Sequence, residues 1–270
     1  MNSRPDDVSD SIVRGTESGD PDWLLAEDGP LIAVNKSAGV LTEGIPSGEQ
    51  TMVGLVKAWL AKKYDKPGNV YLGIPHRLDR VTSGTMVFTR NSKTAARVAE
   101  QFEKRQVSKT YWAMLENRPE ADVGLLVDWL LKVPDRAISD VVAAETAGAK
   151  EARLEYQVLR EVDGRWLVEV KLLTGRMHQI RVQFASRGCP VVGDTKYGAV
   201  PWLDSKQTVG DNTVRDGDAA PGVSESLPAR NLSDMRIALH ARTLSLLHPI
   251  RYDSLTLETP VPDYWQLPGE

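Results

Sequence analysis

The sequence has very little cysteine and no long apolar run. Cys189 is the only cysteine among 270 residues, which excludes a disulfide framework or a cysteine-based zinc site within one chain. No stretch approaches the roughly 18 consecutive apolar residues of a membrane-spanning helix. Residues 1–20 lack the apolar core of a secretory signal. We therefore expect a reduced, cytoplasmic protein that does not enter a membrane.

Net positive charge is also absent, because the chain carries a formal charge of −4 at pH 7. The acidic residues are unevenly placed: residues 1–28 carry −6 and residues 204–226 carry −3, which leaves +5 for the rest. Both acidic segments are poor in large apolar side chains, so we expect a disordered tail over residues 1–22 and a flexible insertion over residues 199–230. The folded domain, expected over residues 23–268, is mildly basic outside these segments and is compatible with a phosphate-bearing partner.

Apolar periodicity predicts a domain that mixes helices with paired strands. The hairpin signal Asp163-Gly164 joins two of the strands, and Ser92 is a suitable helix cap. Because the strands come mostly in hairpin-like pairs, we expect an α+β fold around a largely antiparallel mixed sheet flanked by helices. The predicted strands cover residues 31–35, 69–74, 84–90, 109–115, both sides of the turn within 151–173, and a closing hairpin within 237–260; the predicted helices cover residues 51–63, 93–106 and 177–187.

Residues 73–84, GIPHRLDRVTSG, place one carboxylate among cations. Asp79 has Arg77 and Arg80 as near neighbours, in a loop between two predicted strands. Loops held by a rigid sheet often carry function, and neighbouring positive charge favours the ionised form of a carboxylate. Asp79 is therefore suited to be a nucleophile or the electrostatic partner of a cation, and is poorly suited to be a general acid. The local pattern leaves a second interpretation open, in which Asp79 caps a turn and both arginines are solvated.

Residues 174–188, TGRMHQIRVQFASRG, form a second polar group. On the predicted helix, His178 and Arg181 would share one face, and Ile180 and Phe184 would share an adjacent, buried face. An arginine near a helix start and beside apolar residues commonly meets a carboxylate or a phosphate, and the free N–H groups of the first turn also suit an anion. A surface arginine lying over Ile180 is the alternative, and the local pattern does not choose between the two.

Other candidate sites are weaker on local pattern. Tyr111 lies in a predicted strand, where a tyrosine is more often part of the core than catalytic. Asp194 could supply the second carboxylate that a glycosidase needs, but its surroundings are typical of a turn. Lys196 lies in GDTKYG, which lacks the spacing of a phosphate-binding loop. No pair of histidines has the helical ligand spacing of a metal site, whichever are taken from His76, His178, His240 and His248.

Four segments of the chain form a combination that is more specific than any one of them. They are HRLDRVTSG (76–84), KTYWA (109–113), TGRMHQIRVQFASRGCPVVGDTKYG (174–198) and LHARTLSLLHP (239–249). In this order and spacing they resemble the RluA-type pseudouridine synthases. The resemblance runs from about residue 24 to about residue 265, and its first and third motifs are long. It implies the fold of that family, with a central active-site cleft.

The resemblance also implies an RNA-modifying isomerase that uses no metal and no organic cofactor. In that family the aspartate of HRLD, here Asp79, is the essential catalytic residue. The tyrosine of K-x-Y, here Tyr111, lies against the target base, and the arginine of HQIR, here Arg181, pairs with the catalytic aspartate. The arginine of HRLD, here Arg77, takes part in displacing the base from its stack, a step that costs energy in structured RNA.

The chemical route and the RNA target are left open by the sequence. Asp79 could attack C1′ of the uridine or remove the C2′ proton, and either route needs uracil and ribose held together in one closed pocket. Ribosomal RNA and tRNA are both candidate substrates, and we expect a monomer. A catalytically silent RNA-binding or ribosome-assembly protein of the same fold is the alternative. A nucleoside-hydrolase-like enzyme would instead release free uracil.

Further contacts with RNA are expected from polar residues within the same motifs. Residues 1–28 are too few and too acidic for a recognisable S4-type RNA-binding domain. We therefore expect target selection to come from the folded domain itself, through RNA shape and flipped bases. The expected contact residues are His76, Arg77, Arg80, Lys109, Arg176 and His178. Three positions depart from the commonest pattern of the family without touching the proposed catalytic residues; they are Val81, Met177 and Gln183.

Overall fold

The computed structural model describes residues 19–44, 48–134, 136–202 and 236–267. The expected acidic tail and the expected insertion fall largely outside these residues. No described helix is long and apolar enough to span a membrane. The elements, in chain order, are β1 (Leu24–Asp28), β2 (Leu31–Lys36), α1 (Met52–Lys63), β3 (Ser83–Thr89), α2 (Ser92–Glu103), β4 (Ser108–Leu115), β5 (Val123–Val133), β6 (Ile138–Val142), β7 (Lys150–Val162), β8 (Arg165–Leu172), α3 (Gln179–Ala185), the 3₁₀ helix η1 (Thr195–Tyr197), β9 (Leu239–Leu247), β10 (Ser254–Glu258) and the 3₁₀ helix η3 (Asp263–Trp265).

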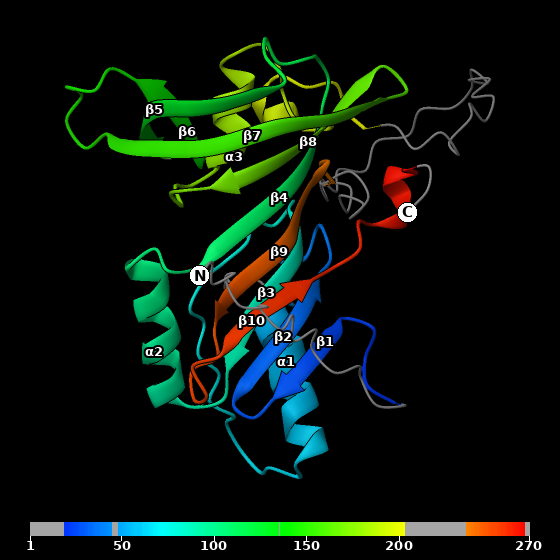
Figure 1. Ribbon diagram of the computed structural model, residues 1–270. Helices are drawn as coiled ribbons and strands as arrows, with labels where there is room; N and C mark the ends of the chain where they lie inside the picture. The colour runs from blue at the N-terminus through cyan, green and yellow to red at the C-terminus, as the bar shows by residue number, and fades with distance from the viewer. Residues whose placement is uncertain (1–18, 45–47, 135, 203–235, 268–270) are drawn as a thin grey trace, which may run out of the picture.

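One mixed sheet carries all the described strands (Figure 1). Its order is β1-β2-β3-β9-β4-β8-β7-β5-β6, and β10 pairs with β9 outside this path. Among the pairs of described strands, only β3 and β9 run parallel, through Ser83 opposite His240 and Gly84 opposite Ala241. The predicted α+β class and the largely antiparallel sheet are therefore confirmed.

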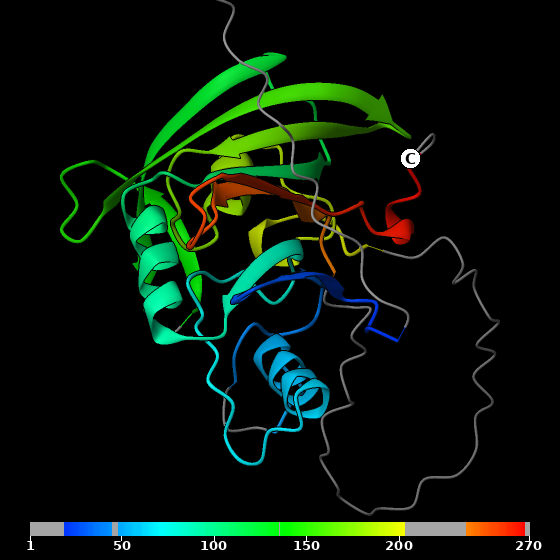
Figure 2. The same ribbon diagram turned by 60° about the horizontal axis from the view of Figure 1, so that its bottom comes forward.

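The first half of the sheet, formed by β1, β2, β3, β9 and β10, is covered on both faces. Side chains alternate across a strand, so Phe88 of β3 packs in one cluster with Val56 of α1. Its neighbour Val87 packs in another with Val98 of α2. Figure 2 shows α1 on one side of these strands. Burial on both faces explains why every residue of β3 is buried.

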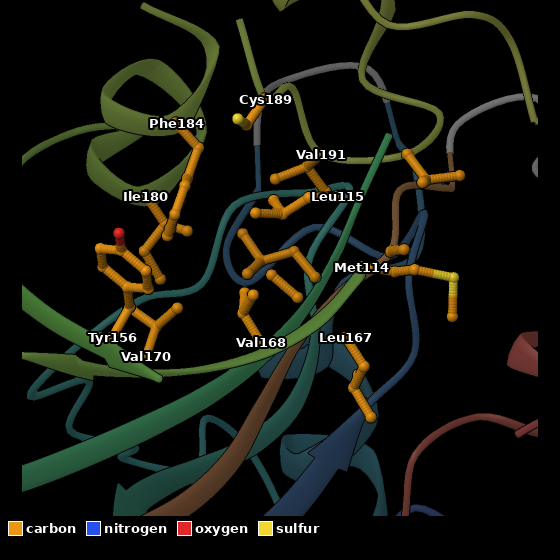
Figure 3. Packing of buried hydrophobic residues seen from close by; sticks show 14 of the residues in the cluster. Met114, Leu115, Tyr156, Leu167, Val168, Val170, Ile180, Phe184, Cys189 and Val191 are labelled. Atoms are coloured by element: carbon orange, nitrogen blue, oxygen red, sulfur yellow. The ribbon is translucent and has the colours of Figure 1, made fainter. Parts of the chain in front are cut away.

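The second half of the sheet, formed by β4, β8, β7, β5 and β6, packs against α3. Ile180 and Phe184 of α3 point at Tyr156 of β7 and Val170 of β8 (Figure 3). The rings of Tyr156 and Phe184 meet edge to face, with centroids 5.4 Å apart. Ile180 and Phe184 are 4% and 1% exposed, so the buried face predicted for this helix is confirmed. This packing fixes the start of α3 relative to the sheet.

The strand predicted over residues 69–74 is wrong. Gly73 alone forms a bridge, to Thr89, and its backbone pairs with that residue at 2.8 and 3.1 Å. Further along, the ring of His76 takes the place of a strand carbonyl, because its Nε2 accepts the N–H of Val87 at 3.0 Å. A side chain thus ends the pairing, and the backbone is free to turn into the loop that carries Asp79. Pro75 lacks an N–H and could not have continued the ladder.

Helix boundaries differ from the prediction by up to three residues, and two of the starts have a clear cause. The cap of α2 is Asn91, whose side chain accepts the N–H of Thr94 at 2.9 Å, and not Ser92. Helix α3 begins at Gln179 and not near residue 177, because His178 adopts a left-handed conformation with φ of 55°. Strands β1, β5 and β6 were not predicted.

Candidate active site

A pocket of about 400 Å³ is lined by residues from both halves of the sheet. The first half supplies the loop over residues 76–82, and the second supplies part of β4, the end of β8 and residues 175–181. The expected central cleft is therefore present. Asp79, Tyr111 and Arg181 all line it, although Arg181 follows Asp79 by 102 positions.

Asp79 lies in a loop that is fixed on both sides. Before it, Leu78 is 6% exposed, and the hydroxyl of Thr42 donates to the Leu78 carbonyl at 2.9 Å and accepts the Leu78 N–H at 3.3 Å. After it, the carbonyl of Arg80 accepts a hydrogen bond from Lys36 Nζ at 3.1 Å. The apolar side chain and the two clamps hold the carboxylate in place, and Asp79 itself remains partly exposed to the pocket.

Lys36 is a fully buried lysine beneath this loop. Its Nζ also donates to the carbonyls of Ser37 at 3.0 Å and Val40 at 2.8 Å, so three acceptors match the three N–H groups of an ammonium. Burial lowers the pKa of Lys36 to about 7, against an opposing effect of Asp79. Sequence reasoning missed this residue. No local pattern indicates its burial, because a lysine at the end of a strand is ordinarily exposed.

Arg181 is the nearest cation to Asp79, with Nη1 3.4 Å from Asp79 Oδ2. Its stronger partner is Asp194, which accepts from Nε at 2.6 Å and from Nη2 at 2.7 Å. Burial alone would lower the pKa of Arg181, but the hydrogen bond and charge of Asp194 raise it above its ordinary value. Asp194 therefore holds the guanidinium so that one edge remains for Asp79.

Asp194 is a second residue of the site that the sequence did not assign. The turn expected around it is present, because Asp194 precedes η1. The side chain is nevertheless 1% exposed and bound to an arginine, which is the arrangement of an ion pair and not of a general acid or base in the pocket. No local pattern shows that a turn residue is buried.

His178 also faces the Asp79 carboxylate, with Nε2 3.6 Å from Asp79 Oδ2. Its Nδ1 lies 2.9 Å from the hydroxyl of Tyr197, which in turn accepts the N–H of Ser139 at 2.9 Å. Burial lowers the pKa of His178 to about 4, with Asp79 opposing this shift, so the imidazole is neutral near pH 7. His178 and Arg181 were expected to share a helix face; instead His178 precedes the helix and reaches Asp79 through its left-handed backbone.

Tyr111 and Lys109 enter the pocket from alternate positions of β4. Burial, and secondarily the charge of Asp79, raises the pKa of Tyr111 well above its ordinary value. The phenol therefore keeps its proton throughout the physiological range. Burial lowers the pKa of Lys109, and its Nζ has no hydrogen-bond or ion-pair partner among the described residues.

The two arginines beside Asp79 in the sequence turn away from it. Arg77 is exposed and pairs with Glu43 at 2.7 Å. Arg80 donates through Nε to the carbonyl of Gly39 at 3.0 Å and pairs with Glu49 at 3.1 Å. Neither arginine forms an ion pair with Asp79, so the sequence neighbours of Asp79 are not its partners in the structure.

The remaining predicted contact residues have structural partners of their own. Arg176 donates through Nε to the carbonyl of Glu151 at 2.9 Å. The ring of His76 stacks on Phe102 with centroids 4.7 Å apart, and burial lowers its pKa to about 3. Both line the pocket. Within the described part of the chain, no group of three or more His, Cys, Asp or Glu side chains is placed to hold a metal ion.

Comparison with known proteins shows which family has this sequence and fold. The family model described as RNA pseudouridylate synthase matches residues 30–186, more than half of the chain. "Ribosomal large subunit pseudouridine synthase C" of Rickettsia prowazekii is 32% identical over 178 residues, which cover 66% of this chain and 56% of that protein. "tRNA pseudouridine synthase C" of Vibrio parahaemolyticus is 29% identical over 263 residues, covering 90% and 92%.

A solved structure supports the same assignment. "Human RNA Pseudouridylate Synthase Domain Containing 4" superposes with a TM-score of 0.66 at 25% identity, covering 90% of each chain. The chain thus spans nearly the full length of this structure and of the Vibrio protein, and little more than half of the Rickettsia protein. The chain belongs to the RluA-type RNA pseudouridylate synthase family.

Proposed function

We propose that this chain converts specific uridines of RNA to pseudouridine, with Asp79 as its catalytic residue. The observation that carries the proposal is the position of the Asp79 carboxylate. It lies in the pocket, 3.4 Å from a buried guanidinium and 3.6 Å from a neutral imidazole. Members of the same family bear names that state this activity.

The reaction makes specific demands on the pocket. The N1–C1′ bond of uridine breaks, a C5–C1′ bond forms, and the proton on C5 is lost while N1 gains one, so nothing is added overall. Asp79 starts this sequence by attacking C1′ or by removing the C2′ proton. The detached uracil and the ribose must remain together while the base turns, and a pocket of about 400 Å³ can enclose them.

Each neighbouring side chain then has a role that its chemistry allows. Arg181 supplies a fixed positive charge to Asp79, and Asp194 orients Arg181. Tyr111 stacks on the uracil, and its protonated hydroxyl can take part in moving the C5 proton after reattachment. Arg77 is exposed and lines the pocket, where a long cation can fill the gap left by a flipped base.

Ribosomal RNA and tRNA are both proposed substrates, because one relative is named for the large ribosomal subunit and another for tRNA. We propose that the chain acts on RNA as a monomer without a metal or organic cofactor. Recognition would then rest on the surface around the pocket.

The test is tritium release from RNA labelled at C5 of uridine, which reports loss of the C5 proton. Wild type should release tritium from total RNA, and Asp79→Asn should release none. Asp122→Asn is the matched control, because Asp122 is exposed and its one ion pair among the described residues is with Arg118, at 2.7 Å. Equal release from wild type and Asp79→Asn, or binding of RNA by wild type without release, would refute the proposal. Free uracil among the products would indicate hydrolysis instead.

A further inference from the structure

A second groove, of about 730 Å³, continues from the active-site pocket. One wall is the end of α2 with the turn into β4, and the other is the end of β8 with the segment that follows it, residues 171–176. The two cavities are contiguous, because both are lined by Phe102, Lys109, Leu172, Gly175 and Arg176. A chain that enters the pocket can therefore extend along this groove.

The groove is lined by more positive than negative charge. Arg105, Lys109, Lys171 and Arg176 line it, against one carboxylate, Glu103. These cations are only lightly engaged within the protein. Lys171 reaches Glu155 at 3.9 Å, and Arg176 uses Nε for a carbonyl. Several N–H donors therefore remain for a polyanion.

Arg105 occupies a backbone position that normally belongs to glycine. The N–H of Arg105 bonds to the carbonyl of Phe102 at 3.2 Å, and the N–H of Gln106 bonds to that of Gln101 at 2.9 Å. This is the Schellman ending of a helix, in which the left-handed residue is usually glycine. Arg105 has φ of 57°, a conformation that is unfavourable for a residue with a side chain.

Only the two backbone hydrogen bonds of the helix end offset this backbone cost, and no side-chain contact among the described residues adds to them. The Arg105 side chain is exposed and has no hydrogen-bond or ion-pair partner among the described residues. A strained residue whose side chain stabilises nothing in the fold points to a role in binding. Because Arg105 lies at the wall of a basic groove, its ligand would be an anion.

We propose that this groove binds the phosphodiester backbone of the RNA strand on one side of the target uridine, with Arg105 and Lys171 as phosphate contacts. The inference rests on the proposed function, which places that uridine in the adjoining pocket. Phosphate contacts of this kind increase the affinity for RNA and position the strand, and they do not depend on which bases the strand contains. The groove would thus hold the strand while the base is flipped.

Arg105→Gly tests the inference without the risk of unfolding, because glycine relieves the backbone strain and should stabilise the end of α2. The variant is made in an Asp79→Asn background, so that RNA is bound but not converted. Dissociation constants for total tRNA and for a ribosomal RNA fragment are measured across a range of salt. Lys93→Ala is the control, since Lys93 is an exposed cation in the first turn of the same helix.

Arg105→Gly should weaken RNA binding about fivefold and reduce the salt slope by about 0.7, the value for one phosphate contact on a single strand. Adding Lys171→Ala should roughly double the loss of slope, to about 1.4. Lys93→Ala should change neither quantity. If Arg105→Gly has the same affinity and slope as Lys93→Ala, the groove does not bind RNA phosphates and the inference is wrong.

A crosslink locates the bound strand. Cys189 is buried, so a photo-crosslinker attached to Arg105→Cys is placed selectively. It should react with nucleotides on one side of the converted uridine, whereas the same reagent on Lys93→Cys should not. Crosslinks equally spread for both variants would overturn the inference. Failure of the proposed function is a separate result, seen as absence of tritium release from wild type while the difference in binding persists.

Discussion

Replacing Asp194 with asparagine would leave the guanidinium of Arg181 buried without its main counter-charge. The carboxylate accepts from Nε and Nη2 at 2.6 and 2.7 Å. An asparagine has one acceptor oxygen and would turn its amide donors toward one of these N–H groups. Among the described carboxylates, only Asp79 would then remain within ion-pair distance of Arg181, at 3.4 Å.

The expected size of the effect follows from burial. Both side chains are at most 4% exposed, and breaking such a pair costs about 3–5 kcal/mol. Since Asp79 still offers some charge, we expect about 3 kcal/mol, the lower end of that range. For a domain of this size, this corresponds to a fall in Tm of about 6–12 °C. Turnover should fall about 100-fold, because Arg181 would be free to move and a displacement of about 1 Å can cost this much.

Thermal unfolding measures the loss of stability. Single-turnover tritium release, measured well below the unfolding temperatures of wild type and variant, reports the loss of turnover separately. Asp128→Asn is the matched control: Asp128 also receives two bonds from one arginine, Arg187, at 2.9 and 3.0 Å. Neither residue lines the pocket, and Arg187 is partly exposed, so we expect a loss of about 1–2 kcal/mol and unchanged turnover. Equal turnover by Asp194→Asn and Asp128→Asn would refute the positioning role of Asp194.

Two other perturbations test buried histidines and the junction of β3 with β9. Burial lowers the pKa of His76 to about 3 and that of His240 to about 4, so the unfolded chain binds these protons first. The free energy of unfolding, measured in urea, should therefore fall as the pH drops from about 6.5, and His240→Asn should make that fall less steep; an identical slope would contradict this. Gly84 has φ of +116°, and a Cβ there would lie 2.3 Å from the carbonyl oxygen of Ala241. Gly84→Ala should therefore cost more than about 4 kcal/mol, whereas Gly164→Ala, in an open turn at φ of +75°, should cost about 1–2 kcal/mol. Similar unfolding midpoints for the two variants would show that β3 and β9 can move apart.

Local patterns predicted those elements whose burial has a clear period or whose turn has its own chemistry. The turn between β7 and β8 has φ of 49° at Asp163 and 75° at Gly164, the pair of positive values that a type I′ hairpin turn requires. Helix α1 begins one residue after its predicted start. The segment 69–74 was misleading because its burial alternates as in a strand, whereas only Gly73 pairs with β3, and the nearby ring of His76 then takes the N–H of Val87.

In the candidate site, too, the sequence predicted some residues and missed others. Asp79 and Arg181 stand in long motifs, so the sequence placed both in the site. Asp194 and Lys36 could not be found from their surroundings, because a charged residue in a turn or at a strand end is ordinarily exposed. Their burial depends on contacts formed only when the whole sheet is assembled.

The central position of β9 has a consequence for the order of assembly. This strand lies between β3 and β4, yet residues 239–247 follow all the strands that it separates. As the chain is synthesised, β3 and β4 emerge with unpaired edges, and the halves of the sheet join only when β9 follows. Asp79 belongs to one half and Arg181 to the other. We therefore expect chains arrested before residue 239 to remain sensitive to protease near β3 and β4, and the contact between Asp79 and Arg181 to be among the last to form in folding.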